Sequence, residues 1–152
     1  MSLDLNVHKL DALLAAINET EMESLTNLLA SAEHVFVYGA GRSGLALRMT
    51  AMRLMHLGLT VHVVGEVTTP AIRERDVLLV ASGSGTTPSI VSAATTADAV
   101  GARVGALTPA RVSPLAALAD AVVIVPAATK TDRSRSASEQ YAGSLFEHAN
   151  LE

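Results

Sequence analysis

The chain has 152 residues, of which 49% are hydrophobic and 3% aromatic, a composition that suits one α/β domain around a single core. Its formal net charge is −4 and its 11 basic residues are spread thinly, which argues against nucleic acid as a partner, while the absence of cysteine excludes disulfides and thiolate catalysis. No apolar run reaches the roughly 20 residues of a membrane-spanning helix, so we expect a cytoplasmic protein with no membrane partner. A mean hydropathy of +0.36 is high for so short a chain and predicts contacts between copies.

The N-terminal segment, residues 3–32, has apolar residues at the spacing of an amphipathic helix. They are Leu10, Leu13, Leu14, Ile17, Met22, Leu25, Leu28 and Leu29. Residues 18–20 are expected to divide the segment into two helices, with Thr20 and Glu23 forming a capping box. Because the segment precedes the first predicted strand, we interpret it as an arm for packing or dimerisation.

From residue 35 onward, short apolar strands alternate with helices. Strands are expected at 35–38, 61–64, 77–80, 104–107 and 121–125, and helices at 45–57, 90–100 and 114–119. Nearly continuous apolar strands indicate a parallel sheet covered on both faces, so we predict an α/β fold, a three-layer α-β-α sandwich with a five-stranded parallel sheet. Beyond residue 126 the sequence turns polar. Residues 127–138 are interpreted as a loop, and a last helix is expected from residue 139 or 140.

The most informative stretch is residues 81–89, a loop rich in glycine and hydroxyl groups that follows the third strand. The next helix is expected to begin near Thr86 or Thr87, with Pro88 in its first turn. Ligands of parallel sheets bind beyond the carboxyl ends of the strands, and a helix N-terminus there attracts anions. We therefore predict a phosphate-binding loop; the alternative is a loop of small residues that only caps the helix. Its expected binding residues are Ser82, Gly83, Ser84, Gly85 and Thr87.

A second glycine-rich loop, residues 39–44, follows the first strand with the spacing G-x-G-x-x-G. This spacing also occurs in NAD-binding domains, and Glu66 stands near the position of their ribose-binding acid. Two features favour a sugar phosphate: Arg42 and Ser43 replace the small apolar residues that admit a pyrophosphate, and a second, hydroxyl-rich loop is present. We expect Gly41, Arg42 and Ser43 to complete the site, with Arg42 orienting the substrate and Ser43 bonding a sugar hydroxyl.

The pattern of Ser82, Ser84 and Thr87 between a strand and a helix resembles the phosphate loop of SIS (sugar isomerase) domains. Within that superfamily the chain resembles the 6-phospho-3-hexuloisomerase family along nearly its whole length. The matching segments are 37–44, 52–58, 64–66, 69–72 and 143–147. Two departures stand out: Thr86 replaces the glutamate usual in the family, and family members usually continue for another helix after this last motif.

The resemblance implies a single flavodoxin-like SIS domain over residues 1–152, with a helical arm (1–32), a parallel core (33–126) and a loop with a C-terminal helix (127–152). It also implies an isomerase of the ribulose monophosphate pathway that interconverts arabino-3-hexulose 6-phosphate and fructose 6-phosphate, as a homodimer or homotetramer. The reaction passes through an enediol and requires no metal or redox cofactor, so none is expected. The alternatives are another SIS phosphosugar isomerase and a non-catalytic module that senses a phosphosugar.

By the same resemblance, Glu147 is the expected catalytic base and His56 a second catalytic group. For Glu147 the alternative is an exposed glutamate on a helix. His56 follows Ser43 by 13 residues, which is about 20 Å along one helix. We therefore expect His56 to lie far from the site of its own chain and to act in that of a neighbouring copy. The alternative is a histidine that caps the C-terminus of its helix.

Overall fold

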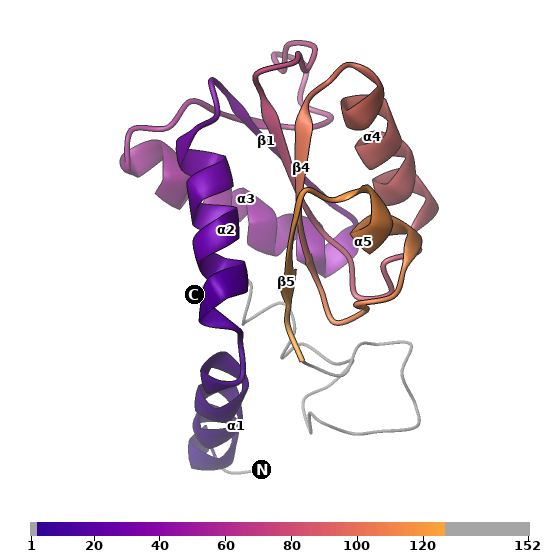
Figure 1. Ribbon diagram of the computed structural model, residues 1–152. Helices are drawn as coiled ribbons and strands as arrows, with labels where there is room; N and C mark the ends of the chain where they lie inside the picture. Colours follow the sequence, from indigo (N-terminus) through magenta and orange to yellow (C-terminus); the bar gives the residue numbers. More distant parts are fainter. Residues whose placement is uncertain (1–2, 127–152) are drawn as a thin grey trace.

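The computed structural model describes residues 3–126, with side chains from residue 7 onward. Figure 1 shows the elements in the colours of the sequence. In chain order they are α1 (Leu3–Ala15), α2 (Glu19–Ala30), β1 (Val35–Gly39), α3 (Gly41–His56), β2 (Val61–Val63), β3 (Val77–Ala81), α4 (Pro88–Ala99), β4 (Arg103–Thr108), α5 (Pro114–Leu118) and β5 (Ala121–Ile124). All five predicted strands are present, each within one residue of its expected bounds. The helix expected from residue 139 or 140 lies outside the described residues.

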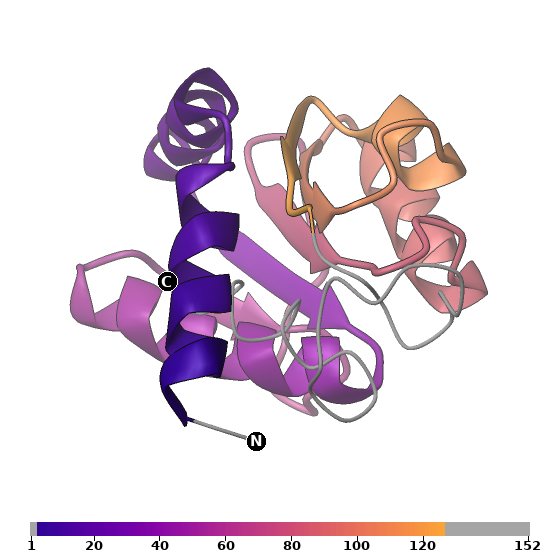
Figure 2. The same cartoon turned by 90° about the horizontal axis from the view of Figure 1, so that it is seen from below.

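The five strands form one sheet in the order β2-β1-β3-β4-β5, and every neighbouring pair is parallel. The chain winds in one direction from β1 to β2 and in the other direction from β3 to β5. Because parallel crossovers are right-handed, this change sends the later helices to the opposite face. Figures 1 and 2 show α2 and α3 on one side of the sheet and α4 and α5 on the other. The predicted three-layer sandwich is confirmed.

The strands are buried on both faces, which explains their continuous apolar sequences. All residues of β3 are buried, and its side chains alternate between two clusters. Leu79 packs in the cluster that contains Leu25 of α2, whereas Leu78 packs with Ile90 of α4. Burying one such side chain stabilises the fold by about 1.5–3 kcal/mol. No helix within residues 3–126 is long and apolar enough to cross a membrane.

The N-terminal segment forms two helices divided where the sequence predicts, but the predicted capping box is wrong. Asn18 is the N-cap of α2, and its side chain accepts a hydrogen bond of 3.0 Å from the N–H of Glu21. Thr20 therefore lies inside the first turn of α2 and does not precede it. The reason is that Asn is at least as good an N-cap as Thr, and Asn18 is reached first along the chain.

Helix α3 begins at Gly41, four residues before the start expected at Leu45. Gly41 has φ +56°, a conformation that glycine adopts without strain. Gly44 then passes so close to β1 that a Cβ on it would collide with the carbonyl oxygen of Gly39. Two glycines in contact thus let the helix start directly after the strand, and most of the predicted loop is the first turn of α3.

Candidate functional site

The two glycine-rich loops start from adjacent points at one edge of the sheet. β1 and β3 are neighbours, and their last residues, Gly39 and Ala81, are partners in the register. Beyond β1 lies β2, and beyond β3 lies β4, so the winding reverses between these two strands. In open parallel sheets, this reversal creates the crevice in which ligands bind. The register therefore places both predicted loops at one candidate site.

Ser82 is the fixed point of the loop between β3 and α4. The residue is only 3% exposed, and its N–H donates a hydrogen bond of 3.0 Å to the carbonyl of Leu107. Its Oγ accepts a hydrogen bond of 3.0 Å from the N–H of Gly85 and lies 3.0 Å from Oγ1 of Thr87. These bonds fold the loop back on itself, so that the hydroxyls of Ser82 and Thr87 meet at the start of α4.

Thr87 occupies the N-cap position of α4, as predicted, but its hydroxyl makes no capping hydrogen bond to the helix. The hydroxyl pairs with Ser82 instead. Pro88 has no N–H, and the N–H of Ile90 donates to the carbonyl of Thr87 at 3.0 Å, so the N–H of Ser89 is the first-turn donor left without the partner that an N-cap threonine usually provides. An anion placed here would accept a hydrogen bond from the N–H of Ser89 at the positive end of the helix dipole. This arrangement supports the phosphate-binding prediction over a loop that only caps the helix.

The outer part of the same loop turns tightly. Exposed Ser84 accepts hydrogen bonds from the N–H of Thr86 at 3.2 Å and from its hydroxyl at 2.9 Å. Gly85 has φ +66°, and a Cβ there would collide with the side chain of Ser113, the N-cap of α5. Ser113 is distant from this loop in the sequence, so its place beside Gly85 was not predicted, although a serine directly before Pro114 is a typical cap signal.

The first turn of α3 supplies the other side of the crevice. Gly41 is exposed, Arg42 is half-buried and Ser43 is buried, with 8% of its surface exposed. Their position follows from the short link to β1, since only Ala40 separates Gly39 from the helix. All three predicted residues are therefore located at the edge that carries the loop of Ser82.

Glu66 lies just after β2 and forms an ion pair with Arg48 of α3, with 2.8 Å between Oε1 and Nη1. Both side chains are about half exposed, so the pair adds at most about 1 kcal/mol to stability. The carboxylate that would bind the ribose of a dinucleotide is thus paired with a helix cation. This pairing weakens the NAD interpretation.

His56 is the last residue of α3, whereas Ser43 is in its first turn. The two residues therefore lie at opposite ends of a helix that crosses the sheet, and His56 is not brought to the loops of its own chain. The His56 side chain is exposed and borders a groove between α2 and α3. Glu147, the expected base, lies outside the described residues.

The SIS domain matches residues 28–142, which is most of the chain. The chain belongs to the SIS domain family. This SIS domain is 59% identical over 133 residues to a protein of Mycobacterium gastri named 3-hexulose-6-phosphate isomerase, covering 88% of this chain and 67% of the relative. It is 38% identical over 138 residues to a Bacillus subtilis protein of the same name, covering 90% of this chain and 75% of the relative.

A solved structure from Methanococcus jannaschii, from which a molecular function of 3-hexulose-6-phosphate isomerase was inferred, has the same fold. Its TM-score is 0.78 at 28% identity, covering 98% of this chain and 82% of that one. The name is a synonym of 6-phospho-3-hexuloisomerase, so the resemblance predicted from the sequence is confirmed. The roles of individual residues in this SIS domain stay predictions.

Proposed function

We propose that this SIS domain is a 3-hexulose-6-phosphate isomerase that interconverts arabino-3-hexulose 6-phosphate and fructose 6-phosphate in the ribulose monophosphate pathway of the cytoplasm. One support is the name carried by relatives at 59% and 38% identity. The observation that carries the proposal is the pairing of the Ser82 and Thr87 hydroxyls, 3.0 Å apart, at an uncapped helix start beside β1. This arrangement suits the phosphoryl group of a small sugar.

In the proposed complex, the phosphoryl group is held by the loop between β3 and α4. Ser82 and Thr87 donate from their hydroxyls, and the N–H of Ser89 in the first turn of α4 adds a backbone donor. Gly83 and Gly85 let the backbone approach the anion closely. Arg42 and Ser43, across the crevice, orient the sugar through its hydroxyl groups.

The chemistry moves a carbonyl between C3 and C2 of the sugar. A base removes the proton from C2 of the 3-ketose, the enediolate forms, and a proton is returned to C3 to give the 2-ketose. We assign the base to Glu147, which belongs to the segment that resembles the family. A second proton moves from the C2 hydroxyl to the C3 oxygen, so the reaction balances with proton transfers alone and needs no oxidant or reductant.

A second copy of the chain is part of the proposal. Leu45, Met49 and Met52 on the solvent side of α3 are 63%, 58% and 60% exposed. With His56 they follow one another at intervals of four, three and four residues, which is typical of a helix seam that packs on another helix. An apolar seam of this kind is usually covered in an assembly. We propose a homodimer or homotetramer in which His56 of one copy assists proton relay in the site of its neighbour.

The direct test is an assay with arabino-3-hexulose 6-phosphate, with sedoheptulose 7-phosphate and arabinose 5-phosphate as control substrates. We expect turnover to fructose 6-phosphate and no conversion of the controls. Conversion of a control alone would identify a different SIS isomerase. Binding of fructose 6-phosphate without any turnover would identify a phosphosugar sensor.

A second test follows the proton. Fructose 6-phosphate incubated with the protein in D₂O should gain deuterium at C3, observed by NMR, because the 2,3-enediol exchanges its proton with solvent. Glu147→Gln should slow this exchange by a factor of at least about 100, since a positioned base contributes about 10²–10⁴-fold. Unchanged exchange in Glu147→Gln would rule out this residue as the base.

A further inference from the structure

The loop between β3 and α4 is held from outside by the first turn of α5. The carbonyl of Gly85 accepts a hydrogen bond of 3.1 Å from the N–H of Leu115, which belongs to that turn. Gly85 also lies against Ser113, the N-cap of α5, so closely that a Cβ added to the glycine would collide with the serine side chain. Two segments that are distant in the sequence therefore meet at one glycine of the candidate site.

The start of α5 is a fixed support for this contact. The Leu115 side chain is fully buried and belongs to the same core cluster as Ile90 of α4. Ser113 determines where the helix begins, because its Oγ accepts a hydrogen bond of 3.2 Å from the N–H of Ala116. The same hydroxyl donates to the carbonyl of Ala110 at 2.9 Å. The single proton of this hydroxyl is used inside its own turn, so Ser113 is suited to supporting the loop and not to binding a ligand.

We propose that Ser113 is a positioning residue for phosphate binding, a role that rests on the proposed function. By fixing the first turn of α5, Ser113 keeps the N–H of Leu115 directed at the carbonyl of Gly85. The N–H of Gly85 then stays directed at Oγ of Ser82, 3.0 Å away. Because Oγ of Ser82 accepts this hydrogen bond, its own proton is directed elsewhere, toward Thr87 or the phosphoryl group. The contacts thus run from Ser113 through Gly85 to the hydroxyl that binds the anion.

Such a support matters because the loop turns on a glycine. Gly85 has φ +66°, and a glycine has more backbone conformations to lose on ordering than any other residue. A loop that is already fixed in the free protein does not have to be ordered when the phosphate binds. Loss of the support therefore weakens the binding of the substrate and of the transition state equally. This change raises KM and leaves kcat nearly constant.

Ser113→Ala tests the role, because it removes both hydrogen bonds of the hydroxyl. We expect the KM for arabino-3-hexulose 6-phosphate to rise about tenfold, which corresponds to the cost of ordering one backbone residue. The Kd of fructose 6-phosphate, measured by calorimetry, should rise by a similar factor, while kcat should change less than about twofold. Ser113→Thr keeps the hydroxyl and should restore both the KM and the Kd.

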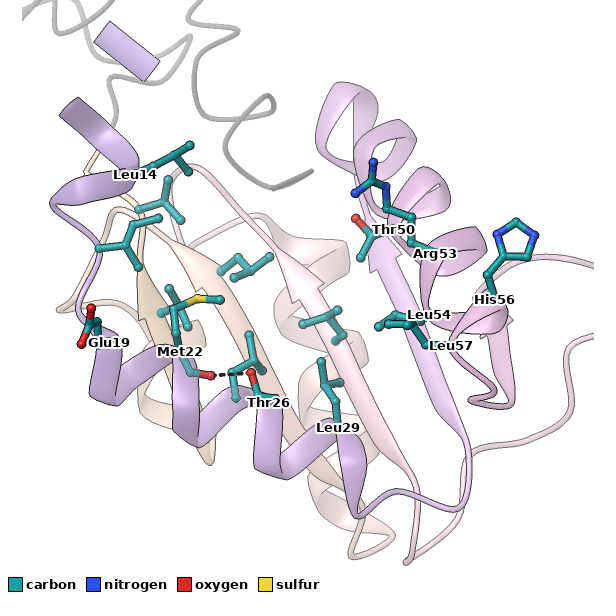
Figure 3. A pocket seen from close by; sticks show the side chains of 16 residues that line it. Leu14, Glu19, Met22, Thr26, Leu29, Thr50, Arg53, Leu54, His56 and Leu57 are labelled. Carbon is teal, nitrogen blue, oxygen red and sulfur yellow. Dashed lines mark hydrogen bonds between the residues drawn. The ribbon is translucent and has the colours of Figure 1, made fainter. Parts of the chain in front are cut away.

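Ser31→Ala is the matched control, because the Ser31 hydroxyl also makes two hydrogen bonds. It donates to the carbonyl of Leu28 at 2.8 Å and accepts from Arg103 at 2.6 Å. Ser31 is the C-cap of α2, the helix that forms one wall of the groove in Figure 3, and Arg103 is the first residue of β4. The control therefore lies at the sheet edge opposite the phosphate loop. Ser31→Ala should destabilise the protein in urea about as much as Ser113→Ala and leave the KM unchanged.

Hydrogen exchange of the Gly85 amide, measured by NMR without any ligand, tests the support independently of turnover. We expect this exchange to be about tenfold faster in Ser113→Ala, with the amide of Leu79 in β3 unchanged. Unchanged exchange at Gly85, an unchanged KM in an active enzyme, or equal KM values for Ser113→Ala and Ser31→Ala would each overturn the positioning role. Faster exchange in a protein that neither binds nor converts the sugar phosphates would instead overturn the proposed isomerase, with the support of the loop by Ser113 upheld.

Discussion

Ser82 is the residue on which the proposed phosphate loop depends, because its buried hydroxyl contacts both Gly85 and Thr87. In Ser82→Ala both contacts are lost, so the loop opens and one phosphate donor disappears. We expect the KM for the sugar phosphate to rise about 10- to 100-fold, since a hydrogen bond to a charged group contributes about 1.5–3 kcal/mol. The control is Thr95→Ala, because Thr95 is exposed on α4 and its hydroxyl donates to the carbonyl of Val91 in the same helix. Equal effects of the two variants in steady-state kinetics would contradict the assignment.

Variants of Thr87 test whether its hydroxyl binds the ligand or caps helix α4. Removal of a capping threonine costs about 0.5–2 kcal/mol, but Thr87 makes no capping bond. Thr87→Val keeps the shape of the side chain but removes the hydrogen bond to Ser82, so we expect the free energy of urea unfolding to fall by only about 1 kcal/mol. The KM should rise about tenfold, as expected for one hydrogen bond to an anion, and Thr87→Ser should restore it. A large loss of stability with an unchanged KM would instead make Thr87 a cap.

At the level of elements, the start of α3 depends on the contact between Gly39 and Gly44. In Gly44→Ala, the added methyl group meets a backbone carbonyl that cannot move without shifting β1. We expect a loss of about 3 kcal/mol in the free energy of unfolding, the upper end for overpacking. Gly58→Ala is the matched comparison, because Gly58 has φ +94° and nothing within 4 Å of the added Cβ. It should lose only about 1 kcal/mol from backbone strain; equal losses would mean that the contact is unimportant.

Glu21 ties helix α2 to the sheet edge near the site. Its carboxylate accepts hydrogen bonds from Arg111 at 2.7 Å and from the N–H of Ile124 in β5 at 3.0 Å. Burial raises the pKa of Glu21, but these two hydrogen bonds and the charge of Arg111 outweigh it, so the pKa lies below its ordinary value. A lowered pKa in the folded state means that the stabilisation is present at neutral pH and is lost as the pH falls through that pKa.

Glu21→Gln should therefore lower the free energy of unfolding by about 1–2 kcal/mol at pH 7, as for a hydrogen bond to a charged group. The difference from the unchanged protein should shrink toward zero in acid, when the native carboxylate is protonated as well. Urea unfolding measured between pH 7 and pH 3 follows this change, and Glu23→Gln on the same helix is the control. A difference that stays constant with pH would mean that the charge of Glu21 is not what anchors α2.

Across the whole molecule, the sequence is sufficient to predict the sheet and the edge from which both glycine-rich loops start. Strands such as β3 are buried on both faces, so their apolar runs are visible without any tertiary information. What escaped prediction depends on contacts between distant or competing residues. The early start of α3 requires two glycines from different elements to be in contact. The N-cap of α2 could be any of several neighbouring polar residues, and in the structure it is Asn18. The hydrogen bond between the hydroxyls of Thr87 and Ser82 likewise depends on the folded shape of the loop.

The last prediction concerns the assembly, because one chain cannot bring His56 to its own phosphate loop along α3. His56→Ala and a loop variant, Ser82→Ala with Thr87→Val, should each be nearly inactive alone. In an equal mixture with free subunit exchange, a working site needs an intact loop, present in half of the subunits, and an intact His56 on the neighbour, also present in half. The mixture should therefore recover about a quarter of the native activity in a symmetric oligomer. Native mass spectrometry verifies the exchange, and activity no greater than the average of the two variants after complete exchange would show that His56 does not act across subunits.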